Sequence, residues 1–208
     1  MDRLPTKASE KGRTFTIADF FEAGRDELRL SLVAGGGNLG RSVIEPVVNR
    51  PGLALTGFYD YFAWKRIQVI GKAEMAFLRS LDATTRLDRF RELLDHRAYL
   101  FVCTNGKRPT ADEIALVEKS GAVMLATPLR TRVFAHLSAF VLEKLVAPTT
   151  SIYGTMVEVS GLGVLFEGDP GLGKSETALG LIKRGYALVA DDLTCIRKEV
   201  GNNALYGS

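Results

Sequence analysis

The chain has 208 residues, of which 46% are hydrophobic and 25% are charged, and it carries a formal net charge of +3. This composition is that of an ordinary globular protein with room for one large or two small domains, which argues against an extensively disordered chain. The cations are spread along the sequence without a long Lys/Arg block, so we expect no nucleic-acid partner.

The sequence predicts neither export nor a membrane-spanning helix. The first residues, MDRLPTKASEKGRTF, lack the apolar stretch of a signal peptide, and no run of about 18 apolar residues occurs that would predict a transmembrane helix. Cys103 and Cys195 are too few for a disulfide framework or a cysteine metal site. We therefore expect a cytoplasmic protein with two reduced core cysteines and no membrane partner.

The first 130 residues alternate between short apolar runs and segments of helical periodicity. Strands are expected over residues 28–34, 43–48, 66–70, 99–103 and 122–126, and helices over residues 17–23, 73–81, 86–96 and 110–119. Thr110 is a suitable N-cap for the last of these helices, with Glu113 three residues on to complete a capping box. The alternation predicts an α/β domain with at least some parallel pairing.

A glycine-rich segment, GGGNLG, follows the first expected strand. Gly35, Gly37 and Gly40 fit the spacing G-x-G-x-x-G of dinucleotide-binding loops. That motif requires a helix to open on the glycines, whereas the next segment here is strand-like and contains Pro46. We therefore expect a turn at this point and no dinucleotide site.

Residues 130–146 carry the clearest helical pattern in the chain. Five apolar side chains fall on one stripe at helical spacing: Val133, Leu137, Phe140, Val141 and Leu145. Pro148 ends the helix, and residues 147–151 are expected to be a linker. We place a domain boundary near residue 130, so that residues 1–130 form an N-terminal domain and residues 131–208 a second domain entered through this helix.

The second domain continues as a further α/β region. Strands are expected over residues 152–159 and 164–166, joined by a turn at 160–163, and a helix over residues 174–184 that ends at Gly185. A buried strand over residues 187–190 and another strand over residues 194–198 follow. The expected fold class is thus α/β, with an N-terminal α/β domain followed by a second α/β domain.

The sequence GDPGLGKS lies between the strand 164–166 and the helix 174–184 and fits the P-loop motif G-x-x-x-x-G-K-[ST]. A chance match in a chain this long is on the order of 1%, and the strand before and the helix after meet the requirement of the motif. Its glycines let backbone N–H groups turn toward phosphate oxygens, and the helix directs its positive end at the same anion. The expected phosphate-binding residues are Gly168, Asp169, Pro170, Gly171, Leu172, Gly173, Lys174 and Ser175.

Two pairs of residues carry the chemistry expected of such a loop. Lys174 supplies positive charge for the β- and γ-phosphates, and Ser175 offers a hydroxyl ligand to Mg²⁺. Asp191 and Asp192 end the strand 187–190, and in P-loop proteins a carboxylate at the end of a neighbouring strand contacts Mg²⁺ or orients the nucleophile. We interpret the pair as part of the site, with solvated acids in a strand-end turn as the alternative.

At this point the stretch APTTSIYGTMVEVSGLGVLFEGDPGLGKSETALGLIKRGYALVADDL resembles the kinase domain of bacterial HPr kinase/phosphorylase. The segment RPGLALTGFYDYFAWKRIQVIGKAE in the N-terminal part resembles a characteristic segment of the same family. The resemblance covers roughly residues 45 to 198. The P-loop, the VADD strand and the N-terminal segment occur in the expected order, which makes it specific.

The resemblance implies an enzyme that regulates carbon metabolism. Members of this family phosphorylate a serine of HPr, the phosphocarrier of the sugar phosphotransferase system, using ATP or pyrophosphate with Mg²⁺. They also remove that phosphate by phosphorolysis, and they are cytosolic and usually hexameric. Carried over by position, Lys174 is the phosphate-binding lysine, Ser175 the magnesium ligand and Asp192 the catalytic acid/base. For the neighbouring Asp191 two roles are open, support of the site from behind its contact residues or a link to magnesium.

The chain departs from the family pattern in two places. The family has His-Gly, with a catalytic histidine, where this chain has Tyr153-Gly154; a tyrosine is neutral at pH 7 and cannot act as an imidazolium. The chain also ends at Ser208, before a further magnesium-binding Glu, a catalytic Arg and the helices that dock HPr, so the kinase domain is expected to be C-terminally incomplete. A nucleotide sensor without catalysis is the alternative function. A P-loop kinase for small molecules is a third, which the N-terminal resemblance disfavours.

Overall fold

The structure, a computed structural model, describes residues 14–199 and 204–208. Most of the amino-terminal segment MDRLPTKASEKGRTF, for which no signal peptide is predicted, lies outside these residues. The chain divides into two compact units, with the boundary between Val146 and Ala147. No helix of the described part has the length and apolar character needed to cross a bilayer.

A five-stranded sheet forms the centre of the N-terminal unit. Its strands are β1 (Ser31–Ala34), β2 (Val48–Asn49), β3 (Ile67–Ile70), β4 (Leu100–Cys103) and β5 (Val123–Ala126). They lie in the order β1-β5-β4-β3-β2, with β2 to β5 mutually parallel and β1 antiparallel to β5. The predicted parallel pairing is confirmed.

Six α-helices and one short 3₁₀ turn surround this sheet. They are α1 (Ile17–Gly24), η1 (Gly36–Asn38), α2 (Gly52–Leu55), α3 (Lys72–Ser80), α4 (Ala83–Asp95), α5 (Ala111–Ser120) and α6 (Thr131–Val146). The predicted capping box of α5 is present: the Glu113 amide donates to Thr110 Oγ1 at 3.3 Å, and the Thr110 amide donates to Glu113 Oε2 at 2.7 Å. The α1 helix begins with a box of the same kind, at Thr16 and Asp19.

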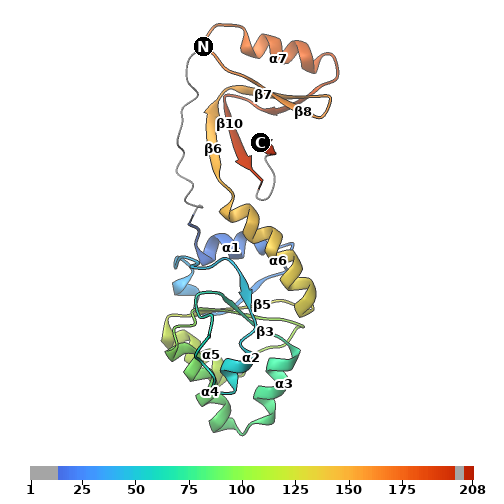
Figure 1. The fold of residues 1–208 in the computed structure, drawn as a ribbon. Helices are drawn as coiled ribbons and strands as arrows, with labels where there is room; N and C mark the ends of the chain where they lie inside the picture. Colours follow the sequence, from blue (N-terminus) through green and yellow to red (C-terminus); the bar gives the residue numbers. More distant parts are fainter. Residues whose placement is uncertain (1–13, 200–203) are drawn as a thin grey trace. The chain divides into compact units, whose positions relative to one another are not determined.

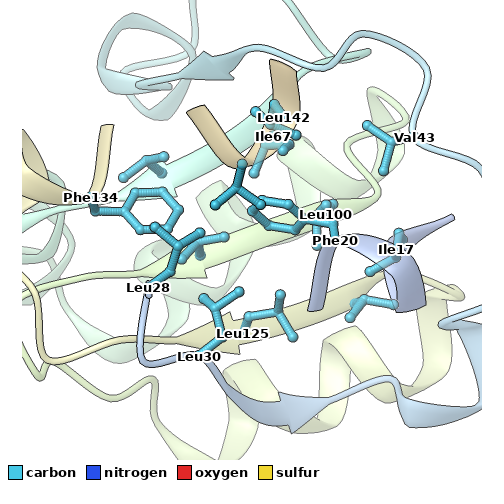
Figure 2. Close-up of a cluster of buried hydrophobic side chains, with 14 of the residues drawn as sticks. Ile17, Phe20, Leu28, Leu30, Val43, Ile67, Leu100, Leu125, Phe134 and Leu142 are labelled. Carbon is cyan, nitrogen blue, oxygen red and sulfur yellow. The ribbon is translucent and has the colours of Figure 1, made fainter. Parts of the chain in front are cut away.

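Both faces of the sheet are covered, which makes three layers (Figure 1). Helices α1 and α6 pack on one face in a cluster with alternate residues of β3, β4 and β5, part of which is drawn in Figure 2. Helices α2 to α5 pack on the other face against the remaining residues of these strands. All residues of β3, β4 and β5 are consequently buried, as expected for parallel strands between two helical layers.

Helix α6 belongs to the N-terminal unit, so the structure divides the chain after this helix and not at residue 130. Phe134, Val141 and Leu142 are buried in the cluster that it shares with α1. Two members of the predicted stripe, Val133 and Phe140, are 42% and 49% exposed, because the face that packs on the sheet is rotated from the one predicted. Burial of one side of α6 in this core is the physical reason for the later division.

The predicted strand 43–48 is mostly wrong. Only Val48 belongs to a strand, because Pro46 has no N–H to donate and the Ile44 amide donates instead to the hydroxyl of Tyr99, at 2.8 Å. The turn predicted at the glycine-rich segment is confirmed: Gly35 has a φ of 76°, and the 3₁₀ turn η1 follows it with no α-helix opening on the glycines.

The described residues of the C-terminal unit, 147–199 and 204–208, form two small antiparallel sheets and one helix. Its elements are β6 (Thr149–Tyr153), β7 (Thr155–Val159), β8 (Leu162–Phe166), α7 (Lys174–Ile182), β9 (Ala187–Ala190), β10 (Leu193–Lys198) and β11 (Leu205–Gly207). One sheet has the order β11-β10-β6 and the other β8-β7-β9. Helix α7 contacts β7 and β9 of the second sheet.

Three predictions for this unit need correction. The strand predicted over 152–159 is two strands, because the chain breaks at Gly154, where an added Cβ would lie 2.6 Å from the Phe166 carbonyl oxygen. The linker predicted at 147–151 is largely β6, which pairs with β10. The strand β9, predicted to be buried, is exposed at three of its four residues, although it pairs with β7 and contacts α7.

Candidate phosphate-binding site

The topology of the sheet β8-β7-β9 brings the P-loop and the Asp191-Asp192 pair to one edge. Strands β8 and β9 both run antiparallel to the central strand β7 and therefore parallel to one another. Their carboxyl ends meet at the start of β7, where Thr155 pairs with Phe166 and Met156 with Ala190. Loops that follow parallel strand ends gather at one edge of a sheet, the usual place of a ligand in α/β proteins.

The backbone of the P-loop depends on glycine. Gly168, Gly171 and Gly173 have φ values of 146°, 89° and 80°, which side chains with a Cβ rarely adopt. An added Cβ on Gly171 would meet no atom within 4 Å, so the requirement there is conformational and the space beside the loop is open. Gly173 then caps helix α7 without a side chain, which leaves the amides of the first turn for a ligand.

The Lys174 side chain lies across this loop. Its Nζ donates to the carbonyl oxygen of Gly168 at 2.6 Å and to that of Asp169 at 2.9 Å. These contacts hold the ammonium group against the backbone of the loop, and Lys174 lines the hollow beside it. The position fits the role that the motif predicts for this lysine.

The loop forms one wall of a hollow of about 610 Å³. The residues that line it are Tyr153, Gly154, Thr155, Gly168, Pro170, Gly171, Gly173, Lys174, Ser175, Glu176 and Asp192. The hollow thus brings together residues that the sequence predicts for the site and that lie apart in the chain: Tyr153, the P-loop and Asp192. Asp169, Leu172 and Asp191 are not among the lining residues.

Sequence reasoning missed three lining residues. Gly154 and Thr155 are not among the predicted site residues, because the sequence predicts one strand over residues 152–159. The glycine within this apolar run is a signal for a strand break that could have indicated them. Glu176 follows Ser175 directly, and its place in the first turn of α7 could have suggested a side chain near the loop.

Asp191 and Asp192 have different surroundings. The Asp191 Oδ1 accepts a hydrogen bond from Thr155 Oγ1 at 2.8 Å and another from the Asp192 amide at 3.1 Å. Asp192 has a left-handed φ of 63°, and its carbonyl oxygen accepts from the Gly154 amide at 3.0 Å. The first carboxylate is therefore tied into the structure, while the second faces the hollow.

The residues present fit a cation that binds together with a phosphate. Among the described residues, no group of three or more His, Cys, Asp or Glu is placed to hold a metal by itself. Mg²⁺ commonly uses one or two protein oxygens together with waters and substrate phosphates. The Ser175 hydroxyl and the Asp192 carboxylate line the hollow and are of that kind.

Comparison with known families matches almost the whole chain. Residues 15–141 match the family described as HPr Serine kinase N terminus, and residues 144–208 match the HPr Serine kinase C-terminal domain. An HPr kinase/phosphorylase of Peptoclostridium acidaminophilum is 38% identical over 172 residues, which are 83% of this chain and 56% of that protein. The HPr kinase/phosphorylase 1 of Oceanobacillus iheyensis is 41% identical over 175 residues, 84% of this chain and 56% of that protein.

Among solved structures, the CBS and DRTGG domains of the regulatory region of Clostridium perfringens pyrophosphatase align with 60% of this chain and 48% of that chain. The identity is 16% and the TM-score 0.41. The chain spans about half the length of the curated relatives that it matches. With family matches over both of its units, the chain belongs to the HPr kinase/phosphorylase family.

Proposed function

We propose that the hollow beside the P-loop binds the phosphates of ATP or pyrophosphate with Mg²⁺, and that the chain takes part in phosphoryl transfer to a serine of HPr. The observation that carries the proposal is that one hollow is lined by the P-loop and by Asp192. Family membership supports HPr as the protein substrate, since the relatives are HPr kinase/phosphorylases. The same proposal includes phosphorolysis of phospho-HPr and a role in regulating carbon metabolism. It also includes assembly as a homo-hexamer in the cytoplasm.

The residues of the site would bind the phosphates and Mg²⁺ through different groups. Loop amides and the Lys174 ammonium group bind the phosphate oxygens and hold the transferred group in place. Ser175, with Asp191 as a further candidate, would hold Mg²⁺, which neutralises charge on the phosphates when it is bound. The arrangement fits phosphoryl transfer, in which positioning and electrostatic stabilisation do most of the catalysis.

Asp192 is the proposed acid/base. In the forward direction its carboxylate would accept the proton of the HPr serine as that oxygen attacks the γ-phosphorus and the bond to the bridging oxygen breaks. In phosphorolysis it would return a proton to the serine oxygen as phosphate attacks. Tyr153 lines the same hollow at the place of the family's histidine, is 82% exposed and can donate a hydrogen bond to a phosphate oxygen.

Nucleotide binding is tested at Lys174. Replacement by alanine removes the ammonium group that lies across the loop, so we expect Lys174→Ala to weaken binding of Mg·ATP or pyrophosphate at least about tenfold. Isothermal titration calorimetry measures the two affinities, with the exposed Lys183→Ala as a matched control that keeps wild-type binding. Equal affinity of the wild type and Lys174→Ala would show that the site is assigned wrongly.

The chemical step is tested at the two aspartates. Loss of a general base costs roughly 10² to 10⁴ in rate, so Asp192→Asn should nearly abolish phosphotransfer to HPr while ATP affinity stays close to that of the wild type. Labelled ATP and purified HPr measure the transfer, and Asp191→Asn is assayed beside it. If Asp191→Asn is the inactive variant and Asp192→Asn keeps normal turnover, the roles are reversed.

A non-catalytic nucleotide sensor is the second candidate function. Tyr153 favours it, because this side chain stands in the hollow at the position where the family has a catalytic histidine. A sensor binds ATP through the loop but transfers no phosphate to HPr, so the two assays above separate the candidates. Binding abolished by Lys174→Ala would establish the sensor only if the wild type also transfers no phosphate when it is extended to the length of its relatives.

A further inference from the structure

A buried threonine connects the start of β7 to the Asp191-Asp192 pair. Thr155 is 3% exposed, and its Oγ1 donates to the Asp191 Oδ1 at 2.8 Å. The same Oδ1 accepts from the Asp192 amide at 3.1 Å. One carboxylate oxygen therefore joins the first residue of the central strand to the backbone of the residue that faces the hollow.

The backbone of Asp192 is held from its other side as well. Its carbonyl oxygen accepts from the Gly154 amide at 3.0 Å, and the Leu193 amide donates to the Asp191 carbonyl oxygen at 2.7 Å. The Gly154 carbonyl oxygen in turn accepts from Thr194 Oγ1 at 2.9 Å, and Thr194 is fully buried. These bonds close a ring through residues 154, 155, 191, 192 and 194.

This ring has a conformational consequence. Asp192 has a φ of 63°, in the left-handed region that residues other than glycine seldom occupy unless their surroundings impose it. Residues in that region turn the chain sharply, and here Asp192 lines the hollow while the Asp191 carboxylate accepts from Thr155. The contact with Thr155 thus fixes which of two adjacent aspartates faces the P-loop.

We propose that Thr155 and Asp191 are positioning residues that hold the Asp192 carboxylate beside the phosphate site, a role that rests on the function proposed for Asp192 above. Thr155 touches no reacting atom and acts through Asp191. In this role Asp191 uses its Oδ1, which accepts both hydrogen bonds. The other carboxylate oxygen, Oδ2, accepts none from residues 14–199 and 204–208.

Substitutions at Thr155 separate its hydroxyl from its volume. Thr155→Val keeps the shape and removes the donor, whereas Thr155→Ser keeps the donor and removes a methyl group. Thr150→Val on β6 is the matched control, because the same change is made on an exposed strand residue of the same unit. All three variants are made in the 208-residue chain.

The first measurement does not depend on activity. Amide hydrogen exchange, followed by NMR, reports on the amides of Asp192 and Gly154, which donate within the ring. Loss of one hydrogen bond to a charged acceptor should speed exchange at these two amides about tenfold or more in Thr155→Val, but not in Thr155→Ser or Thr150→Val. The Val157 amide in the same strand should keep its rate; equal acceleration at all three amides would reveal a general loss of stability and overturn the proposal.

The second measurement divides binding from turnover. With HPr as substrate, Thr155→Val should lower kcat about tenfold and leave the KM for ATP within about twofold, and Thr155→Ser should restore kcat. Unchanged exchange at Asp192 and Gly154, or an unchanged kcat despite faster exchange, would overturn the proposal. A wild-type chain that transfers no phosphate at all would sink the proposed function instead, and exchange alone would then decide whether Thr155 holds the backbone of Asp192.

Discussion

The two units differ in how they hold their shape. In the N-terminal unit, β3, β4 and β5 are buried throughout, and two apolar clusters fill the space on either side of the sheet. In the described part of the C-terminal unit, by contrast, the buried apolar side chains are those of Ala147, Val157 and Ala178. Its strands instead expose large apolar side chains, among them those of Leu162, Leu188 and Leu193.

The comparison teaches that stability and function have different physical bases in this chain. Burial of apolar surface contributes most of the free energy of folding, so the N-terminal unit carries most of the stability. The geometry of the candidate site depends on glycines of positive φ and on hydrogen bonds such as that from Thr155 to Asp191. We expect the C-terminal unit to be the less stable of the two and the more sensitive to its ligands.

The largest expected effect comes from separating the units. A fragment of residues 14–146 should unfold in urea in one cooperative transition, because both of its apolar clusters lie within it. A fragment of residues 147–208 should show no cooperative transition of its own. Far-UV circular dichroism during urea titration measures both. A sharp transition in the fragment 147–208 would contradict the comparison.

A matched pair of truncations tests the same difference within the whole chain. Phe101 is fully buried in the central strand β4, with its ring 5.2 Å from that of Phe90, and Phe101→Ala should lower the free energy of unfolding by about 3–5 kcal/mol. Leu188 in β9 is 49% exposed, and Leu188→Ala should cost less than about 1 kcal/mol. Urea denaturation of both variants measures the two losses; a larger loss for Leu188→Ala would show a core in the C-terminal unit that the structure does not contain.

The sequence was most informative where local and tertiary signals agreed. The five helices predicted for the N-terminal unit begin within a few residues of their predicted starts, since caps such as Thr110 with Glu113 act within one turn, whereas the short helix α2 was not predicted. The residues of the hollow were also largely predictable, because the P-loop and the Asp191-Asp192 pair each follow a strand. Their meeting at one edge could be expected from the carboxyl ends of parallel strands.

The failures lie where tertiary contacts decide. Periodicity predicts an apolar side of α6, but the choice between Phe140 and Leu142 as the buried residue depends on the angle at which the helix packs on the sheet. The break at Gly154 depends on the close approach of Phe166, which is distant in sequence. The contact between Thr155 and Asp191 joins the first residue of β7 to the residue that follows β9, and no local pattern encodes the pairing of these two strands.

A smaller effect than that of Phe101→Ala is expected for a buried thiol of the N-terminal unit. Burial of Cys103, with a smaller contribution from the nearby Glu113 carboxylate, raises the pKa of the thiol to about 12, from an ordinary value of 9.0. The folded chain therefore keeps this thiol neutral at pH 10, while about nine tenths of it is ionised in the unfolded chain. Ionisation stabilises only the unfolded chain in this range, so stability is intact below pH 9 and falls as pH rises toward 12.

The change in stability between pH 8 and pH 10 isolates this group when the wild type is compared with Cys103→Ala. The wild type should lose about 1.4 kcal/mol more than the variant over that interval, because one additional proton is released on unfolding. Tyr59, whose pKa burial raises to about 12, titrates in both proteins and cancels in the difference. Val102→Ala, a truncation of the neighbouring buried residue that keeps the thiol, should parallel the wild type. Urea denaturation at both pH values measures all three proteins. If Cys103→Ala also parallels the wild type, the thiol reaches solvent in the folded chain, and the N-terminal core is less closed than its burial indicates.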